Sequence, residues 1–225
     1  MVKVKIIRLI RGIAKTTCFL LLFFLVGIFA LAYIVNIIPH KKYNGQDFEI
    51  EVYKSNEDKD EDKIDDQTDI LQNAREYVAT KPKYKSKYYE SGYPDDEYGV
   101  CTDVVAFALK GAGYDLMKLV NKDIKENRES YDLEEIDKNI DFRRVENLSV
   151  YFQHKAKSLT TDIHDIEQWQ GGDIVVFRHH IGIVSDKRNW QGVPFVIHNA
   201  GQVSGQYEED ILGWWGEITG HYRVS

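Results

Sequence analysis

Residues 171–186 read GGDIVVFRHHIGIVSD and contain two strand-like runs joined by a very short connection. The runs Asp173–Phe177 and His180–Val184 are rich in Val and Ile, which favour strands. A third run, Phe195–His198, follows after a short loop. Because short connections favour antiparallel pairing, this part of the chain predicts a compact antiparallel sheet.

Helical patterns come before this sheet along the chain. The first begins near Asp66 or Thr68 and ends at Lys81-Pro82, because Pro cannot continue a helix. Three more are expected at Cys101–Lys110, Leu116–Asn127 and Asn147–Lys157. Helices followed by a compact sheet indicate an α+β domain.

An apolar run without any charged residue covers residues 17–38. About 20 apolar residues are enough to cross a bilayer as a helix. Five basic residues and no acidic one precede the run: Lys3, Lys5, Arg8, Arg11 and Lys15. Two basic residues follow it, Lys41 and Lys42. This bias predicts a cytoplasmic N-terminus and an extracytoplasmic remainder.

A cleaved signal peptide is the alternative reading of this run. Ala30-Leu31-Ala32 has the small-x-small form of a cleavage site. The chain stays apolar through Ile38, however, where a cleavage region turns polar. We therefore expect a retained single-pass anchor in the cell membrane, and export of the outer domain under either reading.

An acidic run, SNEDKDEDKIDDQTD, covers residues 55–69. It has too little apolar surface to offset its ordering entropy, which predicts a solvated stalk; a specific binding role is the alternative. The expected organisation is a basic cytoplasmic tail, a transmembrane helix, an acidic linker and an outer domain, at residues 1–16, 17–38, 39–66 and 67–225.

The overall charge and the cysteine content limit the possible partners and bonds. The net charge is −7 and the pI is about 5.5, which argues against nucleic acid as the main partner. The chain has two cysteines, and Cys18 lies within the apolar run, so no intramolecular disulfide with Cys101 is expected. The sequence leaves the oligomeric state open.

Cys101 stands at the start of a predicted helix. There, the positive end of the helix dipole and the unpaired backbone N–H groups favour a thiolate. A thiolate is a nucleophile, and the same N–H groups can stabilise an oxyanion. The alternative is a buried structural cysteine, which is common.

Two histidines on neighbouring predicted strands strengthen the nucleophile reading. His180 begins one strand and His198 ends the next, so a thiol, a base and an orienting group are available. Gly182, two residues after His180, is expected to leave room for a helix end. A zinc site using Cys101, His180, His198 and Asp173 is the competing reading, but no metal-ligand spacing supports it, so no metal or cofactor is expected.

Five blocks of sequence resemble a known family. YGVCTDVVAFALKGAGYDL, NIDFRRVENLSVYF, GGDIVVFRHHIGIVSD, VIHNAG and ITGHYR resemble, in this order, the family catalogued as domain of unknown function 1287. That family is similar to the NlpC-type, papain-like cysteine peptidases of the cell wall. The resemblance covers residues 84–223 and implies a Cys-bearing helix packed on an antiparallel sheet that carries the histidines.

The resemblance also implies roles for individual residues. Cys101 resembles the nucleophile, His180 the general base, and His198 the residue that orients this base. Tyr98 resembles a hydrogen-bond donor near the oxyanion. Peptidases of this type hydrolyse amide bonds in peptidoglycan stem peptides, so peptidoglycan, or another extracytoplasmic peptide, is the expected substrate.

The chain departs from the family at one position. The family usually reads I-D-H-R-R, whereas residues 140–144 read IDFRR, which leaves substrate specificity open. Asp141, Arg143 and Arg144 are expected either to bind a substrate carboxylate or to form a structural ion-pair cluster. Asp103 is a further candidate at the site, or a cap of the Cys helix.

Three functions are compatible with these features. The leading expectation is a membrane-anchored cysteine hydrolase, an amidase or endopeptidase. An acyltransferase would use the same acyl-thioester intermediate. A non-catalytic cell-wall binding module would keep the scaffold without the chemistry.

Overall fold

The structure is a computed structural model that describes residues 2–225, and the side chains from residue 11 onward. The basic side chains expected at Lys3, Lys5 and Arg8 therefore lie outside the described part. The chain forms two compact units, Met1–His40 and Lys41–Ser225.

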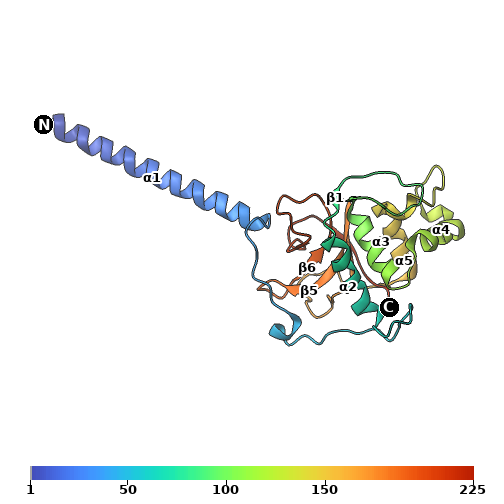
Figure 1. Ribbon diagram of the computed structural model, residues 1–225. Helices are drawn as coiled ribbons and strands as arrows, with labels where there is room; N and C mark the ends of the chain where they lie inside the picture. Colours follow the sequence, from blue (N-terminus) through green and yellow to red (C-terminus); the bar gives the residue numbers. More distant parts are fainter. Residues whose placement is uncertain (1) are drawn as a thin grey trace. The chain divides into compact units, whose positions relative to one another are not determined.

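The first unit is dominated by α1 (Val2–Ile34), a single long helix (Figure 1). Its stretch Arg11–Ile34 has a mean hydropathy of 2.6 and is long and apolar enough to cross a membrane. Its large apolar side chains, such as Phe23, are exposed, as a lipid-facing surface requires. The orientation of this helix in the membrane stays a prediction.

The second unit has a six-stranded antiparallel sheet in the order β3-β8-β4-β5-β6-β7. Its strands are β3 (Lys157–Ser158), β4 (Ile174–Phe177), β5 (His180–Arg188), β6 (Pro194–Ile197), β7 (Glu208–Glu209) and β8 (Ile218–Arg223). The predicted hairpin is confirmed in β4 and β5, which pair Phe177 with His180. The strand β8, which pairs with β4 inside the sheet, is not predicted from its short, Gly-interrupted sequence.

The four predicted helices of this unit are confirmed, with ends that differ by a few residues. They are α2 (Asp66–Ala79), α3 (Cys101–Gly111), α4 (Leu116–Glu126) and α5 (Val145–Lys155). Three short 3-10 helices, η1 (Gly45–Phe48), η2 (Arg128–Ser130) and η3 (Asp141–Arg143), and a parallel pair, β1 (Lys83–Tyr84) with β2 (Tyr98–Gly99), complete it. The predicted α+β class is confirmed.

The alternation of side chains along β5 divides the core between the two faces of the sheet. Ile181 and Ile183 join a large apolar cluster with the buried face of α3. Val184 belongs to a smaller cluster that includes Trp169 and Val196. The period of two in a strand therefore places the Cys-bearing helix on the Ile181 face.

The acidic segment before α2 differs from the solvated stalk expected at residues 39–66. From Lys41 onward it belongs to the second compact unit. Tyr43 forms a β-bridge with Arg188, and the Tyr53 N–H donates to Gln170 Oε1 at 3.1 Å. Asp65 caps α2 by accepting the Thr68 N–H. Carboxylates that accept backbone N–H groups order this segment although it has few apolar side chains.

Candidate active site around Cys101

Cys101 is the first residue of α3 and is nearly buried, with 7% of its surface exposed. The extended backbone of Val100 ends the preceding strand, and the Val100 N–H donates to the Asp103 carboxylate at 2.7 Å. The N–H groups of Ile181, on β5, and of Thr102 are directed at the sulfur. The thiol thus lies between the first turn of its helix and the beginning of β5.

Burial decides the protonation state of this thiol. It raises the pKa of Cys101 to about 11, although the N–H groups of Ile181 and Thr102 lower that pKa. This differs from the thiolate expected from the helix position, because the loss of solvation outweighs the helix terminus. In the free protein, Cys101 is therefore a neutral thiol near pH 7.

The rate of alkylation of Cys101 tests this. With Cys18 replaced by Ser, we expect slow reaction with iodoacetamide at pH 7 and a rate that rises about tenfold per pH unit toward pH 11, because only the thiolate reacts. Intact-mass spectrometry measures the labelling, and a protein lacking both cysteines supplies the blank. A rate that levels off below pH 9 contradicts the assigned pKa direction.

A chain of hydrogen bonds runs behind this thiol through two histidines. His180 Nε2 lies 3.0 Å from His198 Nδ1, and His198 Nε2 lies 3.1 Å from Glu209 Oε2. The Ser204 hydroxyl donates to the other oxygen of Glu209. All three members of the chain are nearly buried. The two histidines predicted to act together are thus adjacent.

The donor and the acceptor of each bond in this hydrogen-bond chain follow from the Glu209 carboxylate at its end. A carboxylate only accepts, so His198 Nε2 must donate to Glu209. The Nδ1 of a neutral His198 is then an acceptor, and His180 Nε2 donates to it. A neutral His180 is therefore left with its lone pair on Nδ1, which makes this atom the available base.

Burial keeps His180 neutral. Loss of solvation, and then the electrostatic interaction with His198, which disfavours a positive charge on both rings at once, lower the pKa of His180 to about 3. The ring of Trp215 covers the pair, with its centroid 4.9 Å from that of His180 and 5.3 Å from that of His198. Trp215 therefore shields part of both imidazoles.

The thiol and the imidazole both lie near the beginning of β5. The N–H directed at Cys101 belongs to Ile181, the residue after His180. Tyr84 lies near the sulfur, since burial and then the charge of Cys101 raise the pKa of Tyr84. Tyr84, His180 and Trp215 line a cavity of about 410 Å³. Among the described residues, no hydrogen bond joins the sulfur to the His180 ring.

Gly182 has a different role from the expected one. A Cβ on Gly182 would lie 2.5 Å from Val196 Cγ1 and 3.3 Å from His198 Cβ. The helix α3 packs on the opposite face, with Ile181 and Ile183. Gly182 therefore makes room for β6 and for His198 and not for a helix end.

Asn199 connects the histidine strand to the segment before Cys101. Its Nδ2 donates to the carbonyl of Gly99 at 3.1 Å and to that of Pro82 at 2.9 Å. These bonds hold the end of β6 against the β1–β2 pair. Asn199 is thus a positioning residue.

Asp103 and Arg143 form a buried bidentate ion pair. Arg143 Nε and Nη2 donate to the two Asp103 oxygens at 2.6 and 3.0 Å, and Arg143 Nη1 donates to the Lys87 carbonyl at 2.7 Å. The side chains are 1% and 0% exposed, which leaves no surface for a substrate carboxylate. For Arg143 the structure therefore agrees with the alternative of a structural ion pair and not with a substrate-binding role. The pair anchors the first turn of α3.

The remaining predicted substrate residues lie outside the cavity beside His180. Asp141 is buried and accepts the Asp137 N–H at 2.8 Å. Arg144 is exposed and lines a separate hollow with Glu134 and Glu135. The Tyr98 ring lies against the Lys85 and Lys87 ammonium groups, with no described contact to Cys101. Phe142, at the position of the usual family His, is 0% exposed and packs against Tyr93.

The alternative zinc ligand set is not brought together. Asp173 is bound by Arg223 at 2.7 Å and lies 3.0 Å from His221 Nε2. This cluster joins β4 to β8 and is capped by Trp169, which stacks on His221 at 3.8 Å. His221 and Arg223 therefore hold the chain end in place.

Glu209 is the site residue that the sequence did not single out. It is one of two adjacent Glu residues in a polar loop, without a hydrophobic pattern or a motif around it. The pairing of Ile197 with Glu208 brings this short strand back to β6. The only sequence signal is its nearness to His198 along the chain.

Comparisons with known proteins agree with the resemblance seen in the sequence. A family model described as "Domain of unknown function (DUF1287)" matches residues 71–224. The uncharacterized protein YijF of Escherichia coli (strain K12) is 40% identical over 167 residues, which is 68% of this chain and 80% of that protein. No solved structure matches the chain significantly.

Proposed function

The chain belongs to the DUF1287 family, and from that premise we propose that it is a membrane-anchored, extracytoplasmic thiol hydrolase with a papain-like arrangement of catalytic groups. Its substrates are peptides with exposed amide bonds, and the stem peptides of peptidoglycan suit an enzyme held at the membrane. The observation that carries this proposal is the hydrogen-bond chain from Glu209 through His198 to His180, whose neighbour along β5, Ile181, directs its backbone N–H at the Cys101 sulfur.

The reaction begins from a neutral pair. As the Cys101 sulfur attacks the amide carbonyl, His180 Nδ1 takes the thiol proton, so no thiolate has to persist in the buried site. The positive charge on His180 is stabilised through His198 by the Glu209 carboxylate. The first-turn N–H groups of α3 stabilise the oxyanion that forms on the former carbonyl oxygen.

The second half of the reaction reverses the proton transfer. His180 gives its proton to the leaving amine, and the acyl group remains as a thioester on Cys101. His180 then takes a proton from water, the resulting hydroxide attacks the thioester, and the thiol is regenerated. The same groups assist the formation and the hydrolysis of the thioester. One base with a fixed orientation, His180, is therefore sufficient for both steps.

The proposal is tested by incubating the full-length protein, in detergent or membranes, with soluble peptidoglycan digests. We expect peptide fragments with a new carboxyl end and a new amine, whose summed mass exceeds the parent by one water. Liquid chromatography with mass spectrometry identifies the bond. A folded protein that leaves every amide of these digests intact, at long incubation, speaks against a wall-peptide hydrolase.

A further inference from the structure

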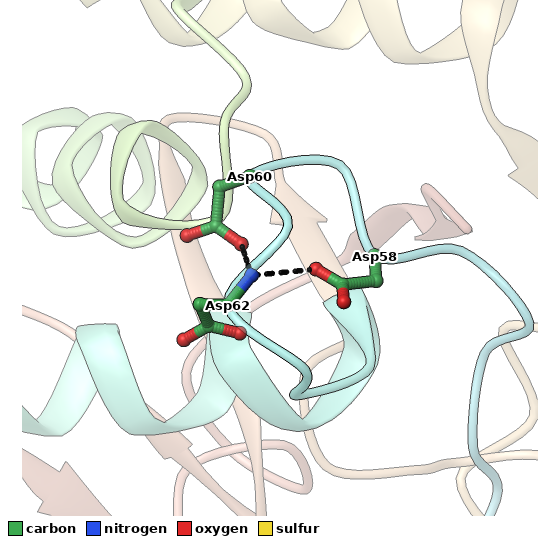
Figure 2. A group of neighbouring side chains, drawn as sticks. All are labelled: Asp58, Asp60 and Asp62. Atoms are coloured by element: carbon green, nitrogen blue, oxygen red, sulfur yellow. Dashed lines mark hydrogen bonds between the residues drawn. The ribbon is translucent and has the colours of Figure 1, made fainter.

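Three carboxylates converge in the loop before α2. Asp58, Asp60 and Asp62 place one oxygen each within 4.8 Å of the others, and Figure 2 shows them gathered around the Asp62 amide nitrogen. All three are exposed to solvent. An exposed acidic group of this kind is common on protein surfaces and does not by itself indicate a ligand.

A fourth carboxylate beside this group has one buried oxygen without a hydrogen-bond partner in the described part of the chain, although Asn73 also interacts with its carboxyl group. Asp69, in the first turn of α2, is only 6% exposed, and its Oδ2 has no hydrogen-bond partner among the described residues. The negative charges of Asp60 and Asp62 act on the Asp69 carboxyl, so this carboxyl lies near the cluster. A buried, unpaired carboxylate oxygen is unfavourable unless a cation compensates it.

The spacing and the backbone of the loop fit a cation. The four residues stand at positions 1, 3, 5 and 12 of a twelve-residue stretch, the positions from which calcium loops supply carboxylates. Position 6, which is Gly in such loops, is Lys63 with a left-handed φ of 77°. The Asp58 carboxylate accepts the N–H of Asp62 at 3.1 Å and that of Lys63 at 2.9 Å.

We propose that the loop Asp58–Asp69 is a Ca²⁺ site, with Asp58, Asp60, Asp62 and Asp69 as carboxylate ligands and the Ile64 carbonyl, at position 7, as a backbone ligand. The donors are all oxygen, which favours a hard cation over zinc or copper. A flexible loop of this length suits Ca²⁺ better than Mg²⁺, which requires a near-ideal octahedron and keeps its waters.

The site has a structural consequence for the second compact unit, to which the loop belongs. Bound Ca²⁺ links the loop to the first turn of α2, which packs against the Cys-bearing helix α3. The loop also lies against the end of α3, because a Cβ on Gly113 would be 3.2 Å from Lys59. Ca²⁺ therefore stabilises the folded state and fixes the segment that follows the anchor.

The experiment uses the full-length protein in detergent, freed of divalent ions with a chelator. Isothermal titration with CaCl₂ is expected to show one saturable site, with a dissociation constant between about 10⁻⁷ and 10⁻³ M. Ca²⁺ is expected to raise the thermal midpoint, and MgCl₂ to bind at least about tenfold more weakly.

Two ligand variants and one control variant decide the assignment. Asp60→Asn, at an exposed position, and Asp69→Asn, at the buried one, should each weaken Ca²⁺ binding at least about tenfold. Glu134→Gln removes a charge from a separate exposed acidic region and should bind as wild type does. Cys101→Ala should also bind normally, because the site does not depend on the hydrolase chemistry.

The proposal is overturned by any of three results. One is the absence of saturable Ca²⁺ binding up to about 10 mM, beyond the weak end of the range for such loops. Another is unchanged affinity in Asp60→Asn. The last is an equal loss in Glu134→Gln, which would show that Ca²⁺ only screens surface charge.

Discussion

A Cys101→Ala protein is expected to release wall-peptide fragments at least ~10³-fold more slowly than wild type. In the proposed mechanism the sulfur forms the acyl intermediate, and the Ala side chain offers no nucleophile in its place. The proposed roles of His180, His198 and Glu209 are to move and orient a proton, so these residues would not replace the nucleophile. The rate of product formation from peptidoglycan digests, followed by mass spectrometry, measures the loss.

The chain supplies a matched control in its other cysteine. Cys18 lies in α1, outside the second compact unit, so Cys18→Ser should hydrolyse as wild type does. His180→Gln should lose a comparable amount of activity, while its Cys101 thiol still reacts with iodoacetamide. This result separates loss of the base from loss of the fold. Undiminished cleavage by Cys101→Ala would overturn the thiol mechanism, because cleavage would then not depend on the Cys101 sulfur.

Replacing Arg143 by Met is expected to lower the free energy of unfolding by roughly 3–5 kcal/mol. The change leaves the Asp103 carboxylate buried without its ion-pair partner, while Met keeps most of the apolar volume. For a domain of this size, the loss corresponds to a fall in thermal midpoint of roughly 6–20 °C. Urea unfolding followed by tryptophan fluorescence, and a thermal scan, measure the two quantities.

The control for this change is an arginine in an exposed pair. Arg178 pairs with Glu217 on the surface, where the two side chains are 66% and 62% exposed. Solvent screens such a pair, so Arg178→Met should change stability by less than about 1 kcal/mol. If the two variants lose the same stability, the buried pair is not what anchors the first turn of α3.

The helices and the central hairpin could be predicted because their signals are local. The apolar spacing of α2 and α3 and the Val- and Ile-rich runs of β4 and β5 lie within single segments. β8 was missed because its pairing with β4 is made across a long stretch of chain and its sequence includes a Gly. The lack of apolar surface in the acidic run predicts a solvated stalk. In the structure, carboxylates that accept backbone N–H groups order this run.

The sequence alone indicated the family to which the chain belongs and singled out Cys101, His180 and His198 as candidates, because these depend on residue type and on the order of short blocks. Only the tertiary structure decided how these groups are connected and ionised. It brought Glu209 to His198 through the β6–β7 pairing, and it buried the thiol, so that desolvation overrode the helix terminus at Cys101. Both effects arise from contacts between segments distant along the chain, and no local pattern records them.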